Sequence, residues 1–431
     1  MSKEENRKNF SKYVSQNILG MIGFSCYVLA DSYFISIAKG ADGLTALNLV
    51  MPLYSIIFSI GEMIGVGSAI RYAISKIKKD ADADDYFWNA IIWCIISSMI
   101  FVFAGIFFSA DIMRVLGADE HIVAVGNNYT KIFMCFAPMF MCNYVTNAFV
   151  RNDGAPGIAM SATLFSSLFN IVFDYILMFP MNLGMEGAAL ATALSPIIGM
   201  GICSIHFFSK KSSVRLVVCK PSVRKLVAGS QLGVSAFVGE MSSAVITLAF
   251  NFVILKLAGN VGVAAYGVVA NIAIVTTAVF NGVAQGSQPL ISSCFGRGDK
   301  DGCTQLKRMG YTTAFVLAAV MYSILFIFAG QFVAVFNSEG SEMLRLYATE
   351  GVKLYFIGIF FAGINIVGGG AFSATEDAFK AAVVSVARGF VLILGAVFVM
   401  SALFGMTGVW LAYAVAEGIT TFIMLVMVLR V

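Results

Sequence analysis

Charged residues are scarce in this sequence. Only 12% of its 431 residues are Asp, Glu, Lys or Arg, whereas 59% are hydrophobic and the mean hydropathy is +0.86. A soluble domain carries about 25% charged residues. A surface built from this composition would not stay dissolved in water, so the composition excludes a soluble globular protein. It indicates a protein embedded in the lipid bilayer.

Histidine is almost absent, since His121 and His206 are the only two. The sequence also lacks HExxH, GxSxG and Walker A motifs, so the signatures of a zinc protease, a serine hydrolase and an ATP-driven pump are missing. The eight cysteines form no CxxC pair and no disulfide framework. We therefore expect neither an enzyme nor a cofactor, and an energy source other than ATP.

Long hydrophobic runs, by contrast, fill most of the chain. About 20 apolar residues in a helix cross the bilayer core, and twelve stretches meet this length. We expect an all-α integral membrane protein with spans at 13–37, 45–70, 87–108, 122–147, 157–179, 187–208, 229–255, 264–290, 311–333, 346–371, 381–404 and 407–429.

The basic residues indicate how these spans are oriented. They gather before the first span and after even-numbered ones, whereas the opposite loops hold only Lys39, Arg114, Lys256 and Arg345. Basic loops stay in the cytoplasm, so we expect a multi-pass plasma-membrane protein with both termini cytoplasmic. The net charge of +4 then reflects topology, and no nucleic-acid partner is expected. The cytoplasmic set is Lys3, Arg7, Lys8, Lys12, Lys76, Lys78, Lys79, Arg151, Lys210, Lys211, Arg215, Lys220, Arg224, Lys225, Arg297, Lys300, Lys307, Arg308, Lys380 and Arg430.

The chain repeats itself. The segment 184–193, GMEGAALATA, recurs at 405–414 as GMTGVWLAYA, and Gly67, Ser68 and Asp80 recur as Gly286, Ser287 and Asp299 at nearly the same offset. Six spans make an even number, so both copies enter the membrane in the same direction. We predict two six-helix bundles, 1–208 and 227–431, related by a pseudo-two-fold axis along the membrane normal. The basic linker 209–226 either lies along the cytoplasmic surface or is a solvated tether.

Four carboxylates lie near the middle of predicted spans: Asp31, Asp174, Glu240 and Glu417. A charged side chain in a lipid-facing helix costs about 2.5–3.5 kcal/mol on insertion scales, so each is a candidate functional residue. Asn170 stands four residues before Asp174, which places both on one helix face. Glu62 is a fifth carboxylate, which either faces a cavity or extends toward the membrane surface.

Several segments resemble the MATE (multidrug and toxic compound extrusion) transporters, bacterial multidrug branch, of the MOP superfamily. The run 170–179, NIVFDYILMF, followed by GMEGAALATALS at 184–195, is similar to the signature of their fifth and sixth helices. Further similar segments are ADSYFI at 30–35, RNDG at 151–154, and QGSQPL at 285–290, which leads to FGRG at 295–298. The resemblance covers nearly the whole chain.

The resemblance implies a site for a proton or Na⁺ in the N-terminal half. The matching positions are Asp31, Asn170, Asp174 and Thr192, and Asn147 and Tyr129 are further candidates. The alternative for these residues is a structural role, because polar side chains also hydrogen-bond helices together.

In the C-terminal half the resemblance implies a coupling or substrate role for Glu240, Gln288 and Arg388. An arginine inside the membrane requires a carboxylate partner, and either Glu240 or Glu417 would serve for Arg388. The sequence departs from the family at the first helix, where 14–17 reads VSQN without the usual proline. A bend of that helix driven by proline is therefore not predicted.

Together these features predict a secondary active exporter, which moves small hydrophobic or cationic compounds outward as H⁺ or Na⁺ enters, by alternating access between two lobes. The resemblance implies a monomer. The alternative is a lipid-linked oligosaccharide flippase of the same superfamily. A pyrophosphate-linked cargo needs basic residues in the cavity, and in this sequence carboxylates outnumber Arg388. An intramembrane enzyme lacks its motifs, and only flux measurements separate a carrier from a channel.

Overall fold

The computed structural model describes residues 3–336 and 341–429, so Arg430 lies outside the described residues. These residues form helices and no strands. In chain order the elements are α1 (Lys3–Lys78), α2 (Asp85–Val115), α3 (Glu120–Cys135), α4 (Ala137–Asn152), α5 (Pro156–Met178), α6 (Gly184–Phe207), α7 (Val223–Gly296), α8 (Lys300–Ile327), α9 (Ala329–Phe336), α10 (Glu342–Tyr355), the 3₁₀ turn η1 (Phe356–Gly358), α11 (Ile359–Ala374), α12 (Ala378–Val386), the π-helical η2 (Ala387–Val391) and α13 (Leu392–Leu429).

The helices account for twelve membrane crossings. In the described part of the chain, nine helices are long and apolar enough to span, or ten when α3 and α4, bent by 46° at their junction, count as one. Among them, α7 has 74 residues and the unit 378–428 has 51. At 1.5 Å per residue each is long enough to cross twice, and each is broken at a glycine. The predicted twelve-helix membrane fold is confirmed.

Three glycines divide the long helices where a loop would be expected. Gly40, Gly259 and Gly405 have φ of 59°, 61° and 58° inside α1, α7 and α13. This left-handed conformation is accessible to glycine at little cost. Gly184, the counterpart of Gly405 in the sequence repeat, has φ of 51°. The repeated sequence therefore produces the same sharp backbone break in both halves.

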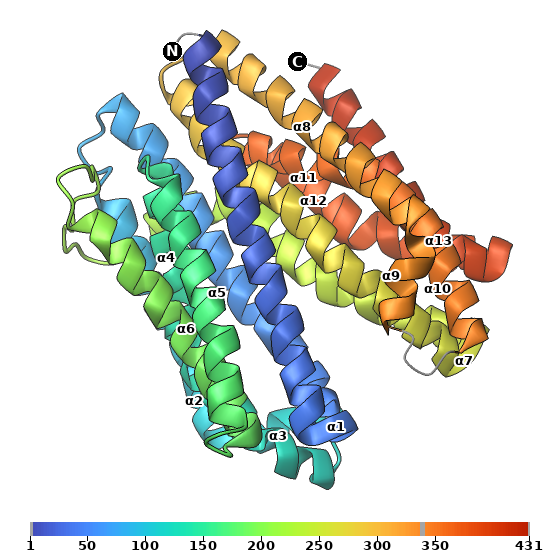
Figure 1. Ribbon diagram of the computed structural model, residues 1–431. Coiled ribbons are helices and arrows are strands. Elements are labelled where there is room, and N and C mark those ends of the chain that lie inside the picture. The colour runs from blue at the N-terminus through green and yellow to red at the C-terminus, as the bar shows by residue number, and fades with distance from the viewer. Residues whose placement is uncertain (1–2, 337–340, 430–431) are drawn as a thin grey trace.

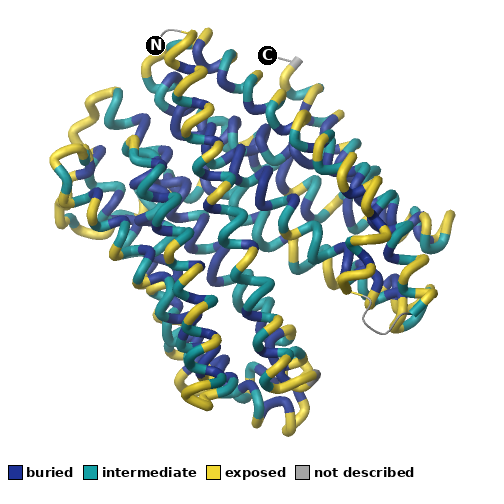
Figure 2. The backbone as a smooth tube through the Cα atoms, viewed as in Figure 1, coloured by how far each residue is buried: buried dark blue, intermediate teal, exposed yellow. Residues whose placement is uncertain are grey.

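The helices form two bundles, which lie side by side in Figure 1. We call α1–α6 the N-lobe and α7–α13 the C-lobe. The two largest cores of buried side chains divide in nearly the same way, one centred on residues 35–214 and the other on 250–416. Figure 2 shows the exposed residues on the outer helix faces and at the helix ends. Many of these are large and apolar, such as Ile100, Phe103 and Phe107 of α2, as expected for a surface that faces lipid.

The lobes touch through glycines of α1 and α7. Gly67 faces the backbone of Gly229, and Gly233 faces the backbone of Met63 so closely that a side chain at either position would overlap it. Gly282 of α7 packs in the same way on the backbone of Ile18. Figure 1 shows the bundles meeting at the end where α1 begins and α13 finishes, and diverging toward the opposite end.

The basic linker lies against the N-lobe. Asp153 at the end of α4 accepts hydrogen bonds from the Ser213 backbone N–H (2.9 Å), the Ser212 hydroxyl (3.1 Å) and the Ser213 hydroxyl. Asn89 of α2 accepts from the Ser222 N–H (2.6 Å) and donates to the Cys219 sulfur (3.1 Å). The linker is therefore held on one lobe along its length and is not a solvated tether.

Candidate functional site

A cavity of about 330 Å³ lies between the two lobes. We call it the outer cavity. It is close to the lower limit of the 300–1,000 Å³ typical of small-molecule sites. Both lobes contribute polar and aromatic residues to its wall: Tyr27, Asp31, Tyr54 and Thr192 from the N-lobe, and Glu240, Tyr266, Asn281, Tyr355, Arg388 and Tyr413 from the C-lobe.

Four predicted residues meet at the N-lobe wall of this cavity. Asp174 and Asn170 of α5 are fully buried, and Thr192 of α6 is almost so. With its amide oriented to satisfy both polar atoms, Asn170 donates to Asp174 Oδ2 at 3.1 Å and accepts from the Thr192 hydroxyl at 3.2 Å. Asp31 of α1 and Thr192 line the outer cavity, whereas Asp174 is not among its lining residues and interacts electrostatically with Asp31. The spacing read from the sequence is thus realised as one cluster.

The two aspartates of this cluster are incompletely bonded. Among the described residues, one carboxylate oxygen of Asp31 and one of Asp174 are buried without a hydrogen-bond partner. A buried carboxylate oxygen without a partner is costly in its charged form. Carboxylate oxygens of this kind suit a proton or a hard cation such as Na⁺.

Tyr129 has a different partner from the one expected. Its hydroxyl lies 2.5 Å from that of Tyr54, and Tyr54 stacks on Phe133 with ring centroids 3.6 Å apart. Tyr54 lines the outer cavity. Tyr129 therefore supports this tyrosine from behind, close to the aspartates but not bonded to them.

The C-lobe wall is built from tyrosines around one ion pair. Tyr355 and Tyr413 stack with centroids 4.4 Å apart. Beside them the Arg388 guanidinium donates to Glu417 at 2.7 and 3.0 Å, and the Asn365 amide donates to the same carboxylate at 2.7 Å. Glu417, rather than Glu240, is the partner of Arg388. Arg388 lies in the π-helical turn η2, a distortion that is frequent at functional sites.

Glu240 of α7 forms no ion pair among the described residues and lines two cavities at once. The second, which we call the inner cavity, has a volume of about 110 Å³ and shares Met21, Phe24 and Phe58 with the outer one. The two cavities are thus adjacent, with Glu240 at their shared boundary.

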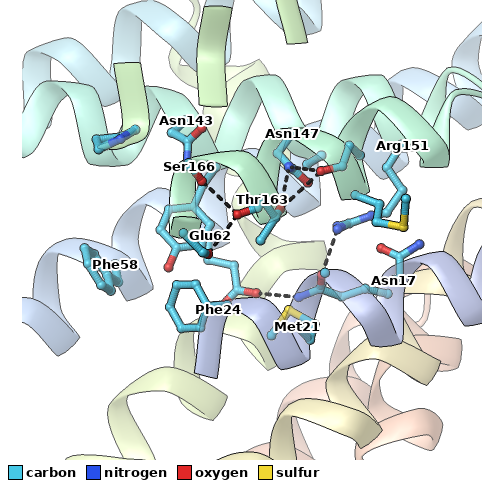
Figure 3. Close-up of a pocket in the computed structure, with 18 of the residues that line it drawn as sticks. Asn17, Met21, Phe24, Phe58, Glu62, Asn143, Asn147, Arg151, Thr163 and Ser166 are labelled. Atoms are coloured by element: carbon cyan, nitrogen blue, oxygen red, sulfur yellow. Dashed lines mark hydrogen bonds between the residues drawn. The ribbon is translucent and has the colours of Figure 1, made fainter. Parts of the chain in front are cut away.

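The inner cavity contains two charged residues that sequence analysis did not place there (Figure 3). Arg151 was expected in a cytoplasmic loop. That expectation was wrong, because α4 continues to Asn152 and buries Arg151 to 4% exposure. Glu62, left open from the sequence, is 8% exposed and faces this cavity. Its bonding partner Gln285 also lines it.

Two other candidates lie apart from the aspartates. Asn147 lines the inner cavity and donates to the Ala159 carbonyl (3.1 Å) and the Thr163 hydroxyl (3.2 Å) of α5, as Figure 3 shows. Gln288 is buried in α7 but is not among the residues that line either cavity.

Comparison with known proteins agrees with this geometry. The family model MatE matches residues 17–176 and 236–399, one segment in each lobe and together more than half of the chain. The chain belongs to the MatE family. The match identifies it as a bacterial MATE transporter homologue, as its motifs predicted.

Relatives and solved structures of MatE transporters match over almost the whole length. The multidrug export protein MepA of Staphylococcus saprophyticus is 26% identical over 410 residues, and that of Staphylococcus aureus is 27% identical over 414 residues; the alignments cover 93% of this chain and 89% of each relative. The fold matches an outward-facing multidrug resistance MATE transporter with a TM-score of 0.92 at 20% identity, covering 99% and 96% of the two chains. A MOP superfamily transporter from Pyrococcus furiosus, described as having a binding pocket of reversed polarity, matches with a TM-score of 0.90.

Proposed function

We propose that this MatE protein is a multidrug exporter, which moves hydrophobic, cationic compounds out of the cell in exchange for H⁺ or Na⁺. The observation that carries the proposal is the pair Asp31 and Asp174, each with an unpartnered buried oxygen, of which Asp31 lines the outer cavity. The names of the MepA relatives, which are multidrug export proteins, support the class of cargo.

The exchange follows because the organic cation and the proton or Na⁺ compete for the same carboxylates. The outer cavity offers carboxylates and tyrosine rings, which attract an organic cation by charge and by cation–π contact. A proton or Na⁺ that binds Asp31 and Asp174 removes that attraction. Entry of one positive charge releases about 2.3 kcal/mol per 100 mV of membrane potential, which drives the export.

Alternating access is supported by where the lobes touch. The glycine contacts of α1 and α7 close the molecule at the end that carries the termini, and the outer cavity lies between the lobes. We propose that this end faces the cytoplasm, that the closed contacts open in the other half of the cycle, and that one chain is sufficient for transport.

The balance of charge favours a cationic cargo over the lipid-linked oligosaccharide of a flippase. Arg388 is the only Lys or Arg side chain among the described residues that line the outer cavity, and Glu417 neutralises it. Asp31 and Glu240 line the same cavity, and neither forms an ion pair with another described residue. A pyrophosphate group would meet net negative charge there.

The test is efflux of a cationic dye from proteoliposomes, with a pH gradient and a Na⁺ gradient imposed separately. We expect one of the gradients to drive dye transport in the wild type, and Asp31→Asn and Asp174→Asn to abolish it while the purified protein remains folded. Asp42 is an exposed carboxylate in the same helix as Asp31, and the variant Asp42→Asn should transport normally. Full gradient-driven efflux by both aspartate variants would refute the assignment.

A further inference from the structure

Gln285 bridges two charges that belong to the opposite lobe. Its amide oxygen accepts from Arg151 Nη1 at 2.7 Å, and its amide nitrogen donates to Glu62 Oε1 at 3.2 Å. Both bonds are drawn as dashed lines in Figure 3. Arg151 belongs to α4 and Glu62 to α1 of the N-lobe, whereas Gln285 belongs to α7 of the C-lobe. We call this arrangement the interlobe bridge.

The two charges fix the orientation of the amide. A guanidinium only donates hydrogen bonds and an ionised carboxylate only accepts them. The Gln285 oxygen therefore faces Arg151 and the nitrogen faces Glu62. Each bond has one charged partner, and such bonds are roughly twice as strong as neutral ones. The bridge is thus strongest when Glu62 is ionised.

The surroundings of Glu62 provide a place for a proton to arrive. The inner cavity of about 110 Å³ has room for about three or four water molecules at ~30 Å³ each. Arg151 Nε and Asn143 Oδ1, both of cavity-lining residues, are buried without a hydrogen-bond partner among the described residues. Such atoms are normally satisfied by bound water. Glu240 lines both cavities and therefore connects the inner cavity with the cargo site.

The groups that face Glu62 come from several elements. Tyr27 of α1, Tyr144 and Arg151 of α4, and Glu240 of α7 are the titratable or charged residues that line the inner cavity with it. The remaining polar lining of α5 and α6, such as Thr163, Ser166 and Ser195, carries no charge. Arg151 is thus the one cation of the described lining, and its hydrogen-bonded link to Glu62 runs through Gln285.

We propose that Glu62 is a second proton-binding residue of the transporter, and that its protonation weakens the interlobe bridge at Gln285 and opens the contact between the lobes. An ionised Glu62 accepts the Gln285 amide and keeps the lobes together. A protonated Glu62 retains only a neutral interaction with that amide. The N-lobe then loses a charge-assisted contact with the C-lobe at the end where the two are closed.

This inference rests on the proposed function in one respect: the coupling of proton binding at Glu62 to a transport cycle assumes that the protein is an exporter. Its structural part stands alone, because the bridge opens or stays closed whether or not cargo moves. An experiment on the lobe separation therefore distinguishes its failure from failure of the exporter assignment.

The experiment measures the distance between the lobes as a function of pH. Spin labels are attached to cysteines that replace Asp80 in the N-lobe and Lys300 in the C-lobe, both of which are exposed. The less buried native cysteines Cys26, Cys135 and Cys219 are first replaced by serine. The protein is studied in lipid nanodiscs by double electron–electron resonance. We expect a longer-distance population that grows as the pH falls.

Variants then separate the proton from the bridge. Glu62→Gln, which imitates the protonated carboxyl, should show the longer distance at every pH, and Glu62→Asp should keep the pH response with a shifted midpoint. Gln285→Met removes the bridge and should also show the longer distance at every pH. Asp42→Asn, which changes an exposed carboxylate outside both cavities, should keep the response, because it leaves Glu62 intact. An unchanged pH response in Glu62→Gln, or a wild-type distance that does not change with pH, would overturn the proposal.

Discussion

Arg388 and Glu417 are joined by hydrogen bonds of 2.7 and 3.0 Å between η2 and α13. Their side chains are 15% and 3% exposed. Removal of one partner of a buried pair leaves the other charge uncompensated, which costs about 3–5 kcal/mol. We expect Glu417→Ala to lower the thermal unfolding midpoint in detergent strongly, and the double variant Glu417→Leu/Arg388→Met to recover much of the loss.

The surface pair Arg345 and Glu342 is the matched control for that prediction. Its side chains are 57% and 66% exposed, and exposed pairs contribute about 0–1 kcal/mol. Arg345→Ala should therefore hardly move the unfolding midpoint. Equal losses for the buried and the exposed pair would show that Glu417 does not stabilise Arg388 in the C-lobe.

A second prediction concerns the glycine contact between the lobes. The Cβ of an alanine at Gly233 would overlap the carbonyl oxygen of Met63. Overpacking of this kind costs about 1–3 kcal/mol. Because the strain exists only while the lobes touch, Gly233→Ala should favour the form in which they are apart, and spin-label distances between positions 80 and 300 should lengthen.

Gly267→Ala is the control for Gly233→Ala. Gly267 lies in the same helix, and a Cβ there would meet nothing within 4 Å. It should leave the distance distribution unchanged. If both alanine variants behave like the wild type, the close approach of α1 and α7 does not decide which form is populated.

A third prediction follows from Asp153, which anchors the linker. Its carboxylate accepts hydrogen bonds from Ser212, Ser213 and His206. Asp153→Ala removes these acceptors, so the linker should detach from the N-lobe. Trypsin should then cleave after the linker's basic residues 210, 211 and 215 faster than in the wild type, as gel electrophoresis would show. Asp301→Ala, at an exposed position of α8, should not change the cleavage rate.

A fourth prediction uses Cys219 as a reporter of the same docking. Burial raises the pKa of the Cys219 thiol, and the Asp85 carboxylate raises it further. The thiolate is the reactive form. A higher pKa leaves less thiolate at a given pH, so alkylation at pH 8 should be slower than that of glutathione and should still rise beyond pH 9.

The hydrogen bonds between Asn89 and the linker should determine how fast Cys219 is alkylated. Asn89→Ala removes the contacts to Ser222 and Cys219. Its own hydrogen bond lowers the thiol pKa, but burial is the larger influence. The net effect of release should therefore be faster alkylation, measured by mass spectrometry. Slower alkylation in this variant would mean that the linker stays in place.

The sequence predicted the helical membrane fold, and it predicted that Asn170, Asp174 and Thr192 lie together. The twelve apolar stretches predict membrane-spanning helices, because in lipid the backbone must satisfy its hydrogen bonds within a helix. The two segments GMEGAALATA and GMTGVWLAYA predict the division into two halves. Asn170 and Asp174 were predicted on one face because four residues make about one helical turn. The structure indeed joins them, and the partner of Arg388 was one of the two carboxylates expected.

The inner cavity could not be predicted from the same signals. Hydropathy ends the fourth span before Arg151, since a charged residue beside Asn152 and Asp153 is typical of a loop. Only tertiary packing shows that Gln285, 134 residues away, meets it. The π-helical turn at Arg388 and the Tyr54–Tyr129 contact are likewise products of packing, and no short sequence pattern encodes them.

The fastening of the linker has a mechanical consequence for the C-lobe. Ser222 caps α7 and is itself bonded to Asn89, and Lys225 in the first turn of α7 pairs with Asp85 of α2. The first turn of α7 is thus pinned to the opposite bundle. A body pinned at one point can swivel about it but cannot slide past its neighbour, so this joint turns any separation of the lobes into a hinged rotation.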